Sequence, residues 1–315
     1  MTQKQMYRKL SRRGLDAPDK VKHVVLSEES IMALVRKCEP LAKEQINVLV
    51  ESIEHTSFES VKLMLFEKQE YYDKCLKLLV ECESVSNFIT VKMRDRFAWI
   101  IQTYFMLESR LGNRNENTHN RFQFDQFEKK IFEFAHSLTA LDSHKAVGLI
   151  DCLFKDKVSE HLAFMNRMKD HPHEQYMYTS KVLEIKGERA KSIMIKYSVD
   201  KEVAAEAEDW LTILNKDLEL ACRLEPDSVV KKIKANIKQN FYPADECLAI
   251  CRKYELTEAC AILCKNVGNY KEAVQYYIEL VNKTINTPKN ILLFKGELYN
   301  LDKHIRVTVH KQKKL

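Results

Sequence analysis

The sequence predicts an all-α fold, an α-solenoid of stacked antiparallel helix hairpins. Three observations predict it. Apolar residues recur at helical spacing along most of the 315-residue chain, turns of two or three residues separate the helical segments, and one segment pattern occurs twice. Short helices of this kind cannot each bury an apolar face alone, so we expect them to stack on their neighbours.

The clearest pattern lies in residues 241–281, which divide into three short helices. Pro243 suits a first helical turn, because its missing N–H would have no partner there. Thr257 is predicted to cap the second helix and Gly268 to end it in a left-handed conformation. Asn269 and Glu272 have the spacing of a capping box at the start of the third helix.

A second copy of this pattern lies 198 residues earlier, because Tyr72–Glu81 aligns with Tyr270–Glu279. At roughly 35–40 residues for each helix pair, such an offset would hold about five repeats. The residues that we predict to pack between repeats are Leu76, Leu79, Cys247, Ile250, Cys251, Leu263, Gly268, Tyr270, Ala273 and Tyr277.

The remaining chain divides around this pattern. We interpret residues 1–25 as a flexible basic arm, residues 26–290 as the solenoid, and residues 291–315 as a basic tail or the start of another repeat. Two interruptions are predicted within the solenoid: a polar loop at 112–121 and an insertion at 185–201, where Gly187 would break the helix. Insertions in solenoids often contact partners, so Lys186, Arg189 and Lys191 are candidate partner contacts.

Composition limits the function classes. Glycine is sparse, with six residues, and the chain contains no phosphate-binding, nucleophile-elbow or zinc-protease motif. We therefore expect no enzyme activity, no catalytic residue and no cofactor. No run of 18 apolar residues and no apolar leader is present, which favours a cytoplasmic protein.

Two groups of residues need a test as metal ligands. Cys247, Cys251, Cys260 and Cys264 have a C-x3-C, x8, C-x3-C spacing, but all four fall at inward helical positions, which favours packing as small apolar side chains over zinc. The pair of histidines beside Pro172 is interpreted as a capped turn. We expect no metal site.

The net charge is +6, and the excess gathers at the two ends of the chain. Basic tails can contact nucleic acid or an acidic membrane surface, but solvated tails are the favoured interpretation. A helical-repeat RNA-binding protein is a less favoured alternative, because no aromatic residues interleave with the charges as in single-strand binders. No nucleic acid is expected as a partner.

Three segments resemble a known family. Leu141–Leu183, Leu218–Val230 with its Glu-Pro step, and Tyr242–Val281 resemble the clathrin-heavy-chain repeats of vesicle-tethering subunits, within them the vacuolar protein sorting eight homologues of the endosomal CORVET complex. The resemblance covers about residues 60–281. Full-length members also carry a β-propeller and a RING finger, which this sequence does not resemble, so a fragment or a shortened paralogue is expected.

The resemblance implies a non-enzymatic scaffold in membrane trafficking. It implies other tethering-complex subunits as partners, a Rab GTPase as a further partner, and peripheral association with endosomal or vacuolar membranes through the complex. The alternative is an adaptor with TPR-like repeats in a vesicle coat or a ciliary transport particle.

Overall fold

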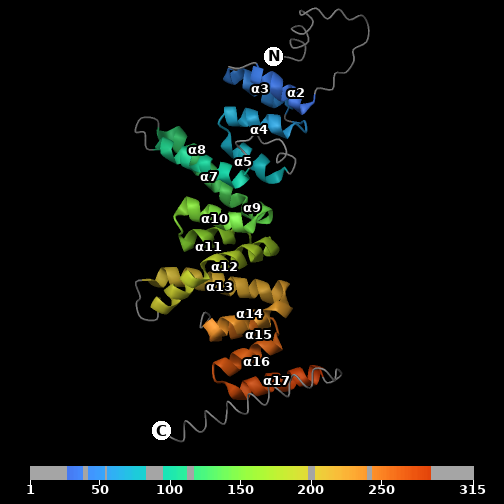
Figure 1. Cartoon of the computed structure of the whole chain (residues 1–315), viewed down its shortest axis with the longest axis vertical. Coiled ribbons are helices and arrows are strands. Elements are labelled where there is room, and N and C mark those ends of the chain that lie inside the picture. The colour runs from blue at the N-terminus through green and yellow to red at the C-terminus, as the bar shows by residue number, and fades with distance from the viewer. Residues whose placement is uncertain are drawn as a thin grey trace, which may run out of the picture. The chain divides into compact units, whose positions relative to one another are not determined.

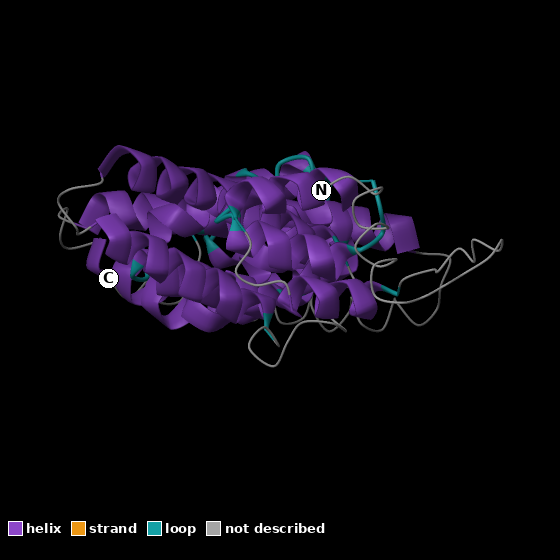
Figure 2. Ribbon diagram, turned by 90° about the horizontal axis from the view of Figure 1, so that it is seen from above, coloured by secondary structure: helices purple, strands orange, loops and turns teal. Residues whose placement is uncertain are grey.

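The computed structural model describes residues 27–37, 42–53, 55–82, 95–111, 117–197, 203–239 and 243–284. Within these ranges the chain forms fifteen α-helices and no strand (Figures 1 and 2). The all-α prediction is therefore confirmed. The predicted basic arm at 1–25 and the tail at 291–315 lie outside the described residues.

The chain forms two compact units, Met1–Leu141 and Asp142–Leu315. The single solenoid predicted over 26–290 stays a prediction. Among the described residues, no helix combines the length and the apolar character needed to cross a bilayer.

The first unit is built around α4 and α5. Its helices are α2 (Glu28–Lys37), α3 (Lys43–Ile53), α4 (Glu59–Lys68), α5 (Tyr72–Glu81), α7 (Arg96–Leu111), α8 (Asn117–Glu133) and α9 (Ala135–Leu141). Helix α4 packs on α2, α3 and α5, and α5 packs in turn on α7, α8 and α9. The Glu28 carboxylate accepts hydrogen bonds from the backbone N–H groups of Ser60 (2.6 Å) and Val61 (3.3 Å), so α2 supplies the N-terminal cap of α4.

The second unit stacks its helices in two interleaved rows. They are α10 (Ser143–Phe154), α11 (Val158–Asn166), α12 (Pro172–Tyr197), α13 (Ala204–Leu224), α14 (Pro226–Gln239), α15 (Ala244–Lys253), α16 (Thr257–Asn266) and α17 (Tyr270–Thr284). Most consecutive helices pack on each other, the most extensive pairs being α12 with α13, α15 with α16, and α16 with α17. Alternate helices also touch: α10 with α12, α11 with α13, α13 with α15, and α14 with α16. This contact pattern, in which neighbours follow one another along the unit in Figure 1, is that of a helical-repeat array.

Two predicted interruptions are wrong where the structure describes them. Helix α8 begins at Asn117, so the second half of the predicted loop at 112–121 is helical, and its polar residues belong to the first turns of that helix. Helix α12 runs without a break through Gly187 to Tyr197, so the predicted interruption of the helix at Gly187 is wrong. A glycine within a helix costs about 1 kcal/mol relative to alanine, and the burial of Val182 and Ala190 on either side offsets this cost.

Of the predictions for the turns around α16 and α17, those for Gly268 and Asn269 are confirmed and that for Thr257 is wrong. Gly268 has φ +82°, and Asn269 caps α17 as predicted, because its Oδ1 accepts from the Glu272 backbone N–H at 3.4 Å. The other bond of the predicted capping box is not formed: the Glu272 carboxylate accepts from Nδ2 of Asn269 at 2.7 Å, while the Asn269 backbone N–H donates to the Cys264 carbonyl. The predicted cap at Thr257 is wrong, because α16 starts at that residue and Leu256 occupies the N-cap position. The Leu256 side chain is partly buried against the apolar cluster of the second unit.

The two copies of the repeated pattern form equivalent helices, α5 and α17, but their surroundings differ. Cys75 and its counterpart Ala273 are fully buried, and so are Leu79 and Tyr277 at 0% and 3% exposure. Val80 is 7% exposed on α5, whereas its counterpart Ile278 is 51% exposed on α17. The difference arises because α7, α8 and α9 cover α5, while α17 packs chiefly on α16.

Candidate functional site

Charged side chains from three helices meet beside the middle of α12, where two of the predicted partner contacts lie. Lys186 places its ammonium 2.7 Å from a carboxylate oxygen of Asp151 on α10, and it also pairs with Asp156 in the turn before α11. Arg189, one turn further along α12, pairs with Asp156 and reaches Glu206 of α13 at 2.9 Å. We call these residues, with His161 and Tyr178, the α12 network.

The structure therefore places two of the three candidate partner contacts in an internal ion-pair network. The Lys186 side chain is only 10% exposed, and Arg189 is 41% exposed but binds carboxylates on two other elements. Lys191 is half-buried on the same helix. These cations hold α10, α12 and α13 together, so partner binding through Lys186 would first have to break bonds within the unit.

His161 connects this network to the core. Its Nε2 lies 2.8 Å from Asp151 and its Nδ1 lies 2.8 Å from the Tyr178 hydroxyl oxygen. In the neutral imidazole Nε2 carries the proton, because a carboxylate can only accept, and the Tyr178 hydroxyl then donates to Nδ1. Both His161 and Tyr178 are 1% exposed, so each finds its partner inside the protein.

The charges in the network stabilise one another. Partial burial opposes ionisation of Asp151, but the hydrogen bonds from His161 and Lys186 outweigh burial and lower its pKa to about 2. Burial acts against the Lys186 ammonium as well, yet the bonds to Asp151 and Asp156 raise its pKa. Burial raises the pKa of Tyr178, so its hydroxyl keeps its proton. Asp151 and Lys186 are thus both ionised near neutral pH.

The geometry limits the chemistry of this network. An acid–histidine–hydroxyl chain can activate a nucleophile, but the hydroxyl here is enclosed in the core, beyond the reach of a substrate. Asp151, Asp156 and His161 each offer a ligand atom within 4.8 Å of the others, which is compatible with a metal ion. However, the Lys186 ammonium already binds both carboxylates, so a metal ion would have to displace it.

A second polar cluster lies where α12 meets α13 and α14. Asp217 is fully buried and accepts hydrogen bonds from Ser180 (2.6 Å) and Thr179 (3.3 Å). Its second oxygen pairs with Lys232 of α14, whose ammonium also lies 5.1 Å from the ring centre of Tyr176. Because a buried carboxylate without partners is costly, this cluster fixes the register of three helices.

Nine of the ten predicted repeat-packing residues lie in or against the cores of the two units, whereas Gly268 is exposed. Those that are at most 3% exposed are Leu76, Leu79, Cys247, Cys251, Leu263, Ala273 and Tyr277. Ile250 and Tyr270 are partly buried against the clusters of the second unit, and Gly268 forms the turn described above. Each of the ten therefore has a packing or turn position.

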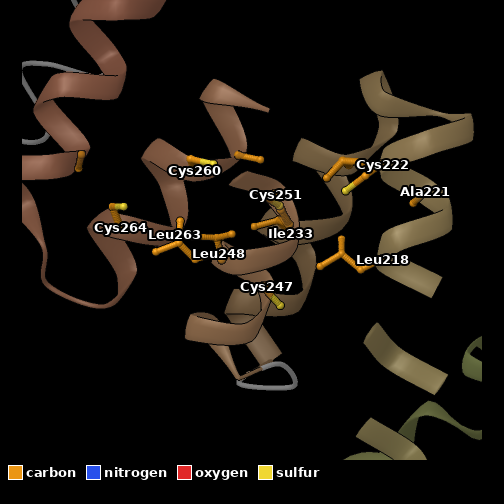
Figure 3. Close-up of a cluster of buried hydrophobic side chains, with 13 residues drawn as sticks. Leu218, Ala221, Cys222, Ile233, Cys247, Leu248, Cys251, Cys260, Leu263 and Cys264 are labelled. Carbon is orange, nitrogen blue, oxygen red and sulfur yellow. The ribbon is translucent and has the colours of Figure 1, made fainter. Parts of the chain in front are cut away.

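Five of the cysteines, Cys222 and the four considered above as zinc ligands, belong to one apolar cluster in the second unit. Cys247, Cys251, Cys260 and Cys264 pack there among aliphatic side chains such as Leu263 (Figure 3). Burial raises the pKa of Cys247 to about 12 and that of Cys260 to about 11, so these thiols stay protonated. A protonated thiol is a small apolar group, which suits this core.

The accessible hollows of the second unit lie along α14, α16 and α17. The larger, of about 800 Å³, contains Lys231, Lys234 and Lys283 together with Asp227, Glu255 and Glu258. The smaller, of about 350 Å³, is lined by Lys234, Ile237, Ile262, Lys265, Asn266, Tyr270 and Tyr277. Lys234 borders both, so the two hollows are adjacent.

No protein-family model, curated protein or solved structure matches this chain. The interpretation of function therefore depends on the chain's own sequence and geometry.

Sequence reasoning missed the members of both polar clusters other than Lys186 and Arg189. A signal was present for two of them. Asp151 interrupts the apolar run Gly148–Phe154, and His161 stands at an inward position of α11. A polar residue on an apolar helix face indicates a buried partner, although only the fold shows which one.

Proposed function

We propose that this chain is a non-enzymatic helical-repeat scaffold that binds other proteins. The observation that carries the proposal is the packing of alternate helices in the second unit, where α10 contacts α12, α11 contacts α13, α13 contacts α15 and α14 contacts α16. Arrays of this type present extended surfaces to partners, and their ionic groups serve to fix helices in register. Both polar clusters around α12 fit that role.

The finer proposal is a subunit of a vesicle-tethering complex of the CORVET type, peripheral on endosomal or vacuolar membranes. What supports it is the resemblance of Leu141–Leu183, Leu218–Val230 and Tyr242–Val281 to the clathrin-heavy-chain repeats of such subunits. Its partners would be other subunits of the complex and a Rab GTPase. The protein would act by holding these partners at fixed separations.

Affinity purification of the tagged chain from its own cells, followed by mass spectrometry, tests the proposal. We expect propeller-and-solenoid subunits and a Rab GTPase to co-purify. Coat or ciliary transport subunits would replace the tethering proposal by the adaptor alternative. Ribonucleoproteins lost on nuclease treatment would favour RNA binding. Recovery of the chain without any stable partner would overturn the scaffold proposal itself.

A further inference from the structure

Two of the buried cysteines in the second unit meet at a contact between two helices. Cys222 belongs to α13 and Cys251 to α15, and these helices pack on each other. Both side chains lie in the apolar cluster of Figure 3, where their thiols form a hydrogen bond with each other. Among the eight cysteines that the structure describes, no other two thiols are bonded in this way.

The bond gives the two thiols different reactivity. It holds the pKa of Cys222 below its ordinary value, although burial acts in the opposite direction. The same bond and burial both raise the pKa of Cys251, so this thiol keeps its proton. Because the thiolate is the form that reacts with oxidants, Cys222 is the sulfur of the pair that reacts first.

The number of thiols that meet here suits a disulfide better than a metal ion. Among the described residues, no three cysteines bring their sulfur atoms within 4.8 Å of one another. A zinc site needs three or four protein ligands, whereas a disulfide needs two sulfurs on adjacent backbones. Cys222 and Cys251 meet the second condition, because they lie on helices that are in contact.

An oxidant has to reach this pair inside a nearly closed core. Cys222 is 4% exposed and Cys251 is 0% exposed, whereas Cys152 of α10 is exposed. A peroxide is small enough to enter when the helices open locally, as native proteins do. We therefore expect oxidation of Cys222 to be slower than that of Cys152.

We propose that hydrogen peroxide joins Cys222 to Cys251 in a disulfide that locks α13 onto α15. The Cys222 thiolate attacks one peroxide oxygen and becomes a sulfenic acid, while the other oxygen leaves as hydroxide and takes up a proton. The Cys251 sulfur then attacks the Cys222 sulfur, and the displaced hydroxide leaves as water with the proton of the Cys251 thiol. Two thiols and one hydrogen peroxide thus give one disulfide and two water molecules.

The disulfide would make the second unit sensitive to redox conditions. Alternate helices of this unit touch, so a covalent link between α13 and α15 also restricts α14, which lies between them in the chain. Oxidation would stiffen the array at this point, and reduction would release it. This inference does not depend on the proposed scaffold function.

Peptide mapping of the full chain tests the inference. The folded protein is treated with hydrogen peroxide, its monomer is isolated, the remaining thiols are blocked in denaturant, and the chain is digested with trypsin without reduction. We expect Asp217–Arg223 to be joined to Gln239–Arg252, and the link to disappear with dithiothreitol. The second peptide also contains Cys247, so the mapping is repeated with Cys247→Ala, in which the link should persist.

Thermal unfolding followed by circular dichroism measures the effect on the array. Peroxide should raise the midpoint of the second unit by about 5 °C, and dithiothreitol should reverse the rise, which it cannot do for oxidised methionine. Cys222→Ala and Cys251→Ala should each abolish the rise. Cys247→Ala is the matched control, because Cys247 is 2% exposed in the same cluster, and it should keep the rise.

Several outcomes would overturn the inference. They are a Cys222 thiol that stays reduced after Cys152 is fully oxidised, conversion of Cys222 to a sulfinic acid without a disulfide, and a link from Cys222 to any cysteine other than Cys251. If one of the alanine variants does not fold, the peptide map of the unchanged protein decides alone.

Discussion

Replacing His161 by Phe tests whether the α12 network stabilises the second unit. The ring gains one atom, and both hydrogen bonds of the imidazole disappear. The Tyr178 hydroxyl, which is buried, then has no acceptor, and an unsatisfied buried group costs about 1–3 kcal/mol. Asp151 loses one donor but keeps Lys186 and is 25% exposed, so we expect only about 1 kcal/mol there. Together we expect a loss of about 3 kcal/mol in the free energy of unfolding.

A double-mutant cycle separates the hydrogen bond from changes in packing. Tyr178→Phe removes the hydroxyl, so adding it to His161→Phe removes the unsatisfied donor as well. The double variant should therefore be more stable than the sum of the single losses predicts, by about 1–2 kcal/mol.

The assay is urea unfolding followed by tryptophan fluorescence. The chain has two tryptophans, and Trp210 is buried in α13 of the second unit. In a Trp99→Phe background, fluorescence reports this unit alone, which matters because two units need not unfold in one step. Two results would refute a stabilising bond between His161 and Tyr178. One is a loss in the double variant that equals the sum of the two single losses within about 0.5 kcal/mol. The other is a loss below about 1 kcal/mol for His161→Phe alone.

Three further predictions concern single side chains. Because the pKa of Asp151 is lowered to about 2, its contribution is present above the pKa of the unfolded chain and is lost as pH falls from roughly 5 to 2. Between pH 5 and 2 the free energy of unfolding of Asp151→Asn, measured with urea, should therefore fall by about 1 kcal/mol less than that of the unchanged protein. An equal fall in both proteins would contradict the lowered pKa of Asp151. Cys152 is exposed whereas Cys247 is buried with a raised pKa, so iodoacetamide at pH 8 should label Cys152 alone of the two, as peptide mass spectrometry can show. Labelling of Cys247 in the folded chain would show that this core opens. Gly268→Ala should destabilise by about 1 kcal/mol, because φ is +82° although space is free for a Cβ atom, whereas Gly148→Ala within α10 should stabilise by a similar amount. Thermal unfolding measures both, and the same sign for both would refute the conformational argument.

Helical periodicity predicted the fold class and the packing residues because burial on a helix follows local spacing. Cys247, Cys251 and Leu263 stand at repeating inward positions, and the structure buries all three. Gly268 and Asn269 were predictable for the same reason, since turns and caps depend on adjacent residues. Gly187 misled the prediction, because its helix cost of about 1 kcal/mol is small beside the packing of a 26-residue helix.

The charged residues could not be predicted in this way, because their partners are distant in sequence. Lys186 meets Asp156 across 30 residues and Ser180 meets Asp217 across 37. Nothing in the sequence near Lys186 distinguishes it from a solvated lysine on a helix surface. Its burial depends on α10 and α11 packing against α12, which is a property of the assembled unit.

This dependence has a consequence for where partners bind. Around the middle of α12 the charges are already used to fix α10, α12, α13 and α14 in register, so a partner there would compete with bonds inside the unit. The ion pair of Lys234 with Glu258, which joins α14 to α16, is instead about half exposed at both side chains. A partner that contacted these helices would therefore disturb fewer bonds inside the unit than one at the middle of α12.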